Sequence, residues 1–256
     1  MAERLTHKIA NLDPSGCSGS NPGRGVLKMT LRLGIDDAGR GPVIGPMALA
    51  GVLIPEELEE TFKELGIKDS KQVPAEKRKL LEKEIKFQAI DYHIALTSAT
   101  ELDNMMNSGT NLNKVEAQKA AEIINKLLAQ LEDKYKDEKI KIIIDCPSTN
   151  LESWKDYLIN HILVNGNIEI SCEHKADINH IAVAAASILA KQAREAELVK
   201  LKKSIGKDFG SGYQTDPKTM KFLEEHSKEH EHDGIFRKSW QTWKNQVAKR
   251  EQKGLF

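Results

Sequence analysis

The stretch Leu33-Gly-Ile-Asp-Asp-Ala-Gly-Arg-Gly-Pro-Val-Ile-Gly45 decides how the rest of the chain can be interpreted. Two adjacent carboxylates, Asp36 and Asp37, close a short apolar run that predicts a strand over residues 31–36. The turn Gly39-Arg40-Gly41 follows at once. A strand that ends in acid and opens into a glycine-rich basic turn would place metal ligands beside a phosphate-binding loop. The remaining segments should then supply further ligands and a surface for nucleic acid.

The composition is that of a globular protein with no net charge. The 256 residues allow one large domain or one domain with a helical appendage, and 39% hydrophobic residues suffice for a core. The formal net charge is zero, so any nucleic-acid surface must be a local patch. The three cysteines, at positions 17, 146 and 172, have no metal-site spacing, which favours reduced thiols and a cytoplasmic location. No apolar run predicts a membrane span, and no signal peptide is expected.

The chain divides into three parts by composition. Residues 1–28 have turn and linker composition and are expected to form a disordered N-terminal extension. Residues 29–204 carry the alternating apolar segments of an α/β domain, and residues 205–256 are expected to form a C-terminal helical segment.

Hydrophobic periodicity predicts a mixed five-stranded sheet flanked by helices. Strands are expected at 31–36, 43–54, 87–97, 140–145 and 167–172, and helices at 56–64, 74–86, 112–131, 151–161 and 178–203. The run 43–54 is apolar almost throughout and should be buried on both faces. Asn113 and Glu116 are expected to form a capping pair at the start of the third helix. Because three strands precede the alternating elements, the first strands should pair antiparallel and the later ones parallel.

Four aspartates form the candidate metal site. Asp36, Asp37 and Asp145 end predicted strands, at the sheet edge where α/β proteins bind ligands, and Asp177 stands just before a helix. Crowded carboxylates need a cation, and oxygen ligands favour Mg²⁺ or Mn²⁺ over zinc. Two such ions about 4 Å apart would stabilise the attacking and leaving oxygens of a phosphodiester. Each aspartate alone is also explained as a turn or N-cap residue, Asp177 especially.

The turn Gly39-Arg40-Gly41 matches neither a Walker loop nor a dinucleotide-binding loop. Taken alone it predicts only a tight turn. Beside an acidic pair it favours a loop whose backbone N–H groups approach a sugar-phosphate.

Basic and aromatic residues alternate at the C-terminal end. The basic residues are Arg237, Lys238, Lys244, Lys249, Arg250 and Lys253, and the aromatic ones are Phe236, Trp240 and Trp243. Such a patch would follow phosphates and stack on bases or sugars. The alternative is a helix whose tryptophans pack on the body of the protein, and both hold if Trp240 faces inward and the basic residues outward.

A zinc-peptidase pattern also occurs, since His226-Ser-Lys-Glu-His230 fits H-x-x-E-H. Its flanks are strongly polar, whereas a protease zinc helix is largely buried. A solvated helix face is the better interpretation.

Separated motifs, in order, resemble type 2 ribonuclease H (ribonuclease HII), most closely its archaeal members. The matching segments are 34–46 (GIDDAGRGPVIGP), 69–71 (DSK), 111–117 (NLNKVEA), 144–147 (IDCP), 174–177 (HKAD), 184–188 (AAASI), 210–213 (GSGY) and 237–240 (RKSW). The resemblance therefore spans positions 33 to about 242.

This resemblance implies an RNase H-like catalytic domain over 29–204 and a C-terminal substrate-binding segment over 205–256. It implies cleavage of the RNA strand of RNA–DNA hybrids and of single ribonucleotides embedded in duplex DNA, as in ribonucleotide excision repair and DNA replication. The products would carry 5′-phosphate and 3′-hydroxyl ends. A monomer is the default expectation.

The resemblance also assigns roles to individual residues. Asp36, Asp37, Asp145 and Asp177 match the catalytic metal ligands. Gly39, Arg40 and Gly41 match the loop that reads the ribose 2′-hydroxyl, Tyr213 matches the tyrosine that stacks on the next deoxyribose, and Lys71 matches a phosphate contact.

One position departs from the family pattern, because Asp37 stands where the family has glutamate. A carboxylate is kept but reaches one methylene less far, and small misplacements of catalytic groups cost rate. We therefore expect a weaker enzyme with a preference for Mn²⁺. The alternative is a catalytically weak or inactive hybrid-binding protein.

Overall fold

The computed structural model describes residues 29–68 and 73–253. The predicted extension 1–28 and the candidate phosphate contact Lys71 lie outside these residues. The elements, in chain order, are β1 (Thr30–Ala38), β2 (Met47–Pro55), α2 (Leu58–Leu65), α3 (Ala75–Gln88), β3 (Asp91–Thr97), α4 (Ala99–Asn107), α5 (Leu112–Ala129), η3 (Asp133–Tyr135), β4 (Lys139–Asp145), α6 (Leu151–Ile159), β5 (Ile168–Glu173), α7 (Ala176–Asn179), α8 (Ile181–Ile205), α9 (Pro217–His226) and α10 (Gln241–Lys253). None of the helices in the described residues is long and apolar enough to cross a membrane.

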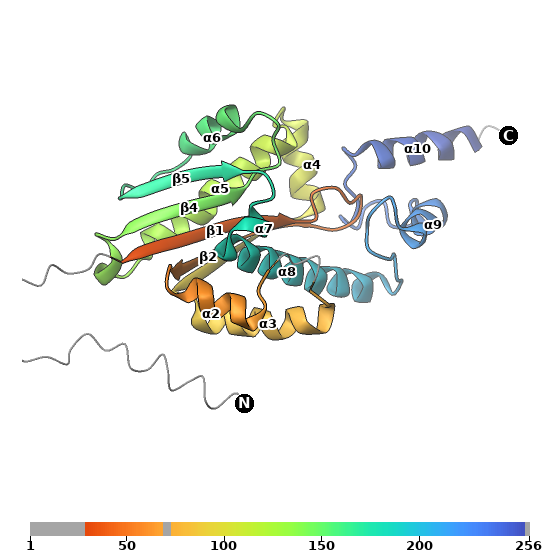
Figure 1. Ribbon diagram of the computed structural model, residues 1–256. Coiled ribbons are helices and arrows are strands. Elements are labelled where there is room, and N and C mark those ends of the chain that lie inside the picture. The colour runs from red at the N-terminus through yellow and green to blue at the C-terminus, as the bar shows by residue number, and fades with distance from the viewer. Residues whose placement is uncertain (1–28, 69–72, 254–256) are drawn as a thin grey trace, which may run out of the picture.

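The sheet has the strand order β3-β2-β1-β4-β5 (Figure 1). Strand β2 pairs antiparallel with both β1 and β3, whereas β4 pairs parallel with β1 and β5. The predicted mixed sheet, with antiparallel pairs first and parallel pairs later, is therefore confirmed. Because β1 and β4 are parallel neighbours, their carboxyl ends meet at one edge.

Helices cover both faces of the sheet (Figure 1). Leu33 and Ile35 of β1 share one core with residues of α4, α5 and α6, while alternate positions face a second core formed with α2, α3 and α8. The second core requires a close approach of α8, because a Cβ at Gly34 would lie 2.1 Å from the carbonyl carbon of Ala182. Strand β2 is buried on both faces, as predicted, because it contributes to both cores.

The C-terminal segment packs beside the loop between β1 and β2. Phe209, Phe222 and Trp243 form a third core with Val43 and Ile44 of that loop. In Figure 1, α9 and α10 lie beyond the edge at which β1 ends. This core fixes the loop that carries the glycine-arginine-glycine turn.

Several predicted boundaries were wrong for local reasons. The second strand begins at Met47 rather than at 43, because Gly45 turns the chain with φ +88° and the preceding residues enter the third core. The third strand begins at Asp91, since α3 continues to Gln88. Helix α4 was not predicted, although Ser98 caps it by accepting a hydrogen bond from the Glu101 N–H. The predicted helix 178–203 is two helices separated at His180, whose backbone is extended.

Candidate active site

Two of the predicted aspartates meet at the paired ends of β1 and β4. The register pairs Ile35 with Ile144. The next residue on each strand, Asp36 on β1 and Asp145 on β4, therefore lies at the same edge of the sheet. The Asp36 side chain is 5% exposed, and its Oδ1 accepts a hydrogen bond from the Asp37 N–H at 2.7 Å. Since successive strand residues face opposite sides, Asp36 turns towards Ser187 of α8 and Asp37 towards α5.

The fourth aspartate, Asp177, lies in α7, a short helix just before α8. The Ala176 N–H donates to Asp145 Oδ1 at 2.9 Å, which ties this helix to the end of β4. Lys175 has φ +56°, an uncommon conformation for a residue with a side chain. Asp177 is 5% exposed and lies inside α7, whose N-cap is Lys175. Asp177 is therefore not the N-cap residue of its helix.

Burial and neighbouring carboxylates raise the pKa values of Asp36 and Asp37. Burial raises the pKa of Asp36 well above its usual range, and the charges of Asp37 and Asp145 add to this effect. Burial and Asp145 raise the pKa of Asp37 to about 6, although the Arg40 guanidinium opposes the shift. Negative charge is thus concentrated at this edge, as expected for a site that binds cations.

A further carboxylate, Glu116 of α5, was missed as a site residue. It is 2% exposed and forms an ion pair with Nη1 of Arg40, while Nη2 of Arg40 donates to Asn113 Oδ1 at 2.7 Å. The predicted capping pair is wrong, because Asn111 caps α5 through a bond from the Lys114 N–H. The available signal was an acidic residue on the apolar face of an amphipathic helix, four positions before Ala120.

The donor chemistry at this edge fits a hard divalent cation. Asp36, Asp37, Asp145 and Glu116 line a small pocket of about 10 Å³, which is roughly the room that one water-sized ion needs. The Glu116 Oε1 atom is buried without a hydrogen-bond partner. Within residues 29–68 and 73–253, no three acidic, histidine or cysteine side chains already converge on one point. Cation binding would therefore have to draw these oxygen donors together.

A second, larger pocket lies on the other side of Asp37. Its volume is about 330 Å³, and its lining residues are Asp37, Ala38, Gly39, Arg40, Gly41, Lys191, Arg194, Glu195 and Tyr213. A Cβ at Gly41 would lie 3.8 Å from the Tyr213 ring, so the turn and the tyrosine face each other across this pocket. The predicted substrate-binding residues that the structure describes are thus brought together.

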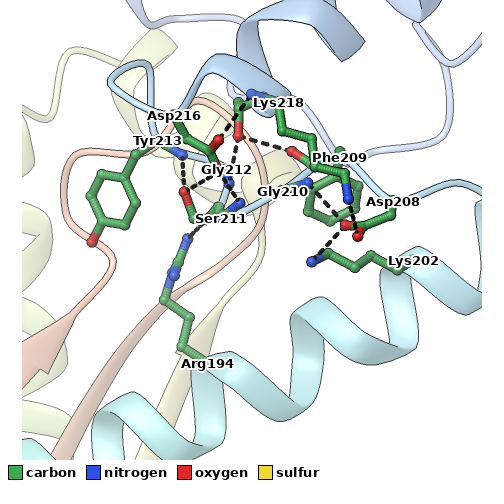
Figure 2. A network of polar contacts seen from close by, with 11 residues as sticks. Arg194, Lys202, Asp208, Phe209, Gly210, Ser211, Gly212, Tyr213, Asp216 and Lys218 are labelled. Atoms are coloured by element: carbon green, nitrogen blue, oxygen red, sulfur yellow. Dashed lines mark hydrogen bonds and ion pairs between the residues drawn. The ribbon is translucent and has the colours of Figure 1, made fainter. Parts of the chain in front are cut away.

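A polar network holds the loop that carries Tyr213 (Figure 2). Asp216 accepts hydrogen bonds from the Ser211 N–H and hydroxyl at 2.7 and 2.8 Å. Arg194 of α8 donates to the Ser211 carbonyl oxygen at 2.9 Å and lies over the Tyr213 ring. The Gly212 carbonyl oxygen accepts from the Val43 N–H at 2.9 Å, which joins the loop to the turn. Sequence reasoning missed Arg194, because the contact depends on how α8 meets two distant loops.

The predicted C-terminal basic patch needs correction. Arg237 is fully buried and donates hydrogen bonds to the carbonyl oxygens of Gly39, Arg40 and Gly45 at 2.6, 2.8 and 2.9 Å. It therefore supports the turn instead of facing solvent. Trp243 is buried and Trp240 is partly buried against two cores, so both tryptophans pack on the body of the protein, as in the alternative interpretation.

Ion pairs further reduce the patch, since Lys249 pairs with Glu224 and Arg250 with Glu231. The basic character of this segment is therefore smaller than its sequence suggested.

The zinc-peptidase pattern does not form a metal site. Helix α9 ends at His226, so the two histidines do not share one helix. The Lys207 Nζ atom lies 2.6 Å from the Glu229 carboxylate and 3.5 Å from His230 Nε2. An ammonium group thus occupies the position that a zinc ion would need.

Buried carboxylates at the joined ends of β1 and β4, beside a pocket lined by a glycine-rich turn, define a metal-dependent nuclease of the ribonuclease H class. The chain belongs to the ribonuclease HII family, whose model matches residues 33–243. Ribonuclease HII of Methanocaldococcus jannaschii is 40% identical over 230 residues, which cover 87% of this chain and 97% of the relative.

Solved structures agree with this assignment. The crystal structure of the ribonuclease H2 from Pyrococcus horikoshii OT3 matches with a TM-score of 0.74 and 32% identity, over 86% of this chain and 98% of that chain. The crystal structure of Bst-RNase HIII in complex with Mn²⁺ matches with a TM-score of 0.71 and 22% identity, over 96% and 80% of the two chains. At that identity the second match shows the fold alone.

Proposed function

We propose that this protein hydrolyses the RNA strand of RNA–DNA hybrids and cuts at single ribonucleotides embedded in duplex DNA. Two divalent ions, Mg²⁺ or Mn²⁺, would support the reaction, leaving 5′-phosphate and 3′-hydroxyl ends. Family membership supports the hybrid substrate, and the finer specificity rests on the geometry of the two pockets.

The observation that carries the proposal is that Asp37 lines both pockets. On one side it lies with Asp36 and Asp145, and on the other it lies with the turn and Tyr213. A phosphodiester placed over Asp37 would therefore have its scissile bond at the carboxylates and its sugar against the turn. This is the arrangement that cleavage at one chosen sugar requires.

Different residues of the chain would bind the ions and the ribose. Asp36, Asp37, Asp145 and Asp177 would hold the ions, which supply an activated water and stabilise the leaving 3′ oxygen. The backbone groups of Gly39, Arg40 and Gly41 would bind the 2′-hydroxyl, the group that distinguishes RNA from DNA at one position.

Tyr213 would complete the substrate site. Its ring is half-buried and lies under the Arg194 guanidinium at 5.1 Å, so its orientation is fixed before substrate binds. A flat ring across the pocket from the turn suits stacking on the deoxyribose that follows the ribonucleotide. This would favour cleavage at an RNA-to-DNA step.

The test compares three duplexes: an RNA–DNA hybrid, a DNA duplex with one ribonucleotide, and an all-DNA duplex. Each is incubated with Mg²⁺, Mn²⁺ or EDTA. We expect cleavage of the first two only, on the 5′ side of the ribonucleotide, lost in EDTA and in Asp145→Asn. Binding without cleavage under either ion would instead indicate a hybrid-binding protein.

Three further expectations stay predictions. Lys71 would contact a substrate phosphate, the protein would act as a monomer, and its location would be cytoplasmic.

A further inference from the structure

The side chain of Arg40 is already engaged before any substrate binds. Its Nη1 atom pairs with the Glu116 carboxylate, and its Nη2 atom donates to Asn113 at 2.7 Å. Both partners come from the first two turns of α5, 76 and 73 positions away in the chain. The guanidinium is therefore held by α5, although Arg40 lines the larger pocket together with Gly39 and Gly41.

The pair is unequal in burial, and this decides what its loss would do. The Glu116 side chain is 2% exposed, whereas the Arg40 side chain is 34% exposed. Removing the buried carboxylate of Glu116 would leave the Arg40 guanidinium without its anion, so the guanidinium would be free to bind water or another anion. Arg40 is exposed enough to turn outward, and the anion next to this pocket in the proposed complex is a nucleic-acid phosphate.

A free arginine at this position would oppose selectivity for ribose. Guanidinium groups bind phosphates on RNA and DNA alike, and such contacts carry no information about the sugar. Backbone N–H and C=O groups held in one geometry can instead respond to a single hydroxyl. Selectivity therefore requires that the arginine side chain be kept away from the phosphates.

We propose that Glu116 is a positioning residue that sets substrate selectivity by holding the Arg40 guanidinium against α5. The turn then presents its backbone, and not its charged side chain, to the nucleic acid. Asn113 supports the same arrangement from the neighbouring turn of the helix. This inference rests on the proposed function, because it concerns how the same pocket distinguishes ribose from deoxyribose.

The test measures binding of the Glu116→Gln protein to two duplexes that differ by one 2′-hydroxyl. It is run in EDTA, so that neither duplex is cut, and at a pH above the Glu116 pKa of about 8, where the parent carboxylate is charged. We expect tighter binding to the all-DNA duplex and a selectivity ratio lower by about tenfold, the effect of losing one charged hydrogen bond. If the released arginine binds a phosphate, the affinity for the all-DNA duplex should also depend more steeply on salt concentration, by about one released counterion. Glu122→Gln, a carboxylate on an exposed part of α5, is the matched control and should change neither quantity.

Repeating the measurement in a protein that lacks the Arg40 side chain distinguishes a role of Glu116 through Arg40 from a direct role of Glu116 in binding. In Arg40→Ala, adding Glu116→Gln should leave the selectivity ratio unchanged, because the residue acts through the arginine. The same drop in both backgrounds, or an unchanged ratio in the single variant, would overturn the inference. A parent protein that binds both duplexes equally and cuts neither would contradict the proposed function itself.

Discussion

The Arg237 guanidinium lies under the turn and donates a hydrogen bond to the Gly39 carbonyl oxygen at 2.6 Å, across 198 positions of sequence. Arg237 donates two further hydrogen bonds, to the carbonyl oxygens of Arg40 and Gly45, so that one side chain holds the turn at three points. A C-terminal arginine thus fixes the backbone that is proposed to meet the ribose. The C-terminal segment contributes to the site through this buried contact.

Replacing Arg237 by methionine should therefore loosen the turn as well as the fold. The change removes the arginine donor from three carbonyl oxygens, two of them in buried hydrogen bonds, and we expect a loss of about 3 kcal/mol or more in the free energy of unfolding. Urea unfolding measures this loss of stability. The cleavage rate at low temperature, where the variant stays folded, measures the effect on the turn itself. Lys238→Met, at the partly exposed neighbouring position, should have a small effect. Equal losses in the two variants would show that the three hydrogen bonds from Arg237 to the turn are unimportant.

Gly39→Ala tests the same turn from the other side. Gly39 has φ +83°, and a Cβ would lie 2.3 Å from Arg194 Cδ and 2.9 Å from the Pro46 carbonyl oxygen. Gly206→Ala is the matched control, since Gly206 also has positive φ but has nothing within 4 Å of a Cβ. The control should cost about 1 kcal/mol of backbone strain. Gly39→Ala should cost more than the control in urea unfolding, and equal costs would show that the close packing is unimportant.

Asp37→Glu tests the departure from the family pattern. The added methylene restores the longer reach, so we expect a cleavage rate equal to or above that of the parent and a weaker preference for Mn²⁺. Asp37→Ala should be nearly inactive. Initial rates with each ion check both expectations, and full activity of the alanine variant would remove Asp37 from the proposed ligands.

The pH dependence of stability should reveal the buried acid Glu116. Burial, with Asp37 nearby, raises its pKa from the usual 4.5 to about 8, although Arg40 opposes the shift. A carboxyl with a raised pKa binds more protons in the folded state than in the unfolded state. It therefore stabilises the protein fully below its unfolded pKa, and this contribution falls as pH rises to the folded value.

Urea unfolding in EDTA at about pH 5 and about pH 8 measures this slope. The parent should lose more stability between the two values than Glu116→Gln, which cannot titrate. Cation affinity should rise over the same range, because ligands must be deprotonated. Identical slopes in the two proteins would contradict the raised pKa.

The sequence predicted those parts of the site that depend on strand ends. Asp36 and Asp145 could be placed together because parallel strands bring their carboxyl ends to one edge. Glu116, Arg194 and Arg237 could not, since each acts through a contact between segments far apart in the chain. Arg237 in particular was interpreted from its basic neighbours, whereas its environment is set by the third core. The same core explains why the second strand begins later than its apolar run suggested.

The most direct test of the account compares two duplexes that are identical except for one 2′-hydroxyl. With Mg²⁺ or Mn²⁺ present, the protein should cut the ribonucleotide-containing strand on the 5′ side of its single ribonucleotide. The product ends should be a 5′-phosphate and a 3′-hydroxyl, and Asp145→Asn should abolish the cut. Cleavage of both duplexes at similar rates, or of neither, would contradict the proposed function.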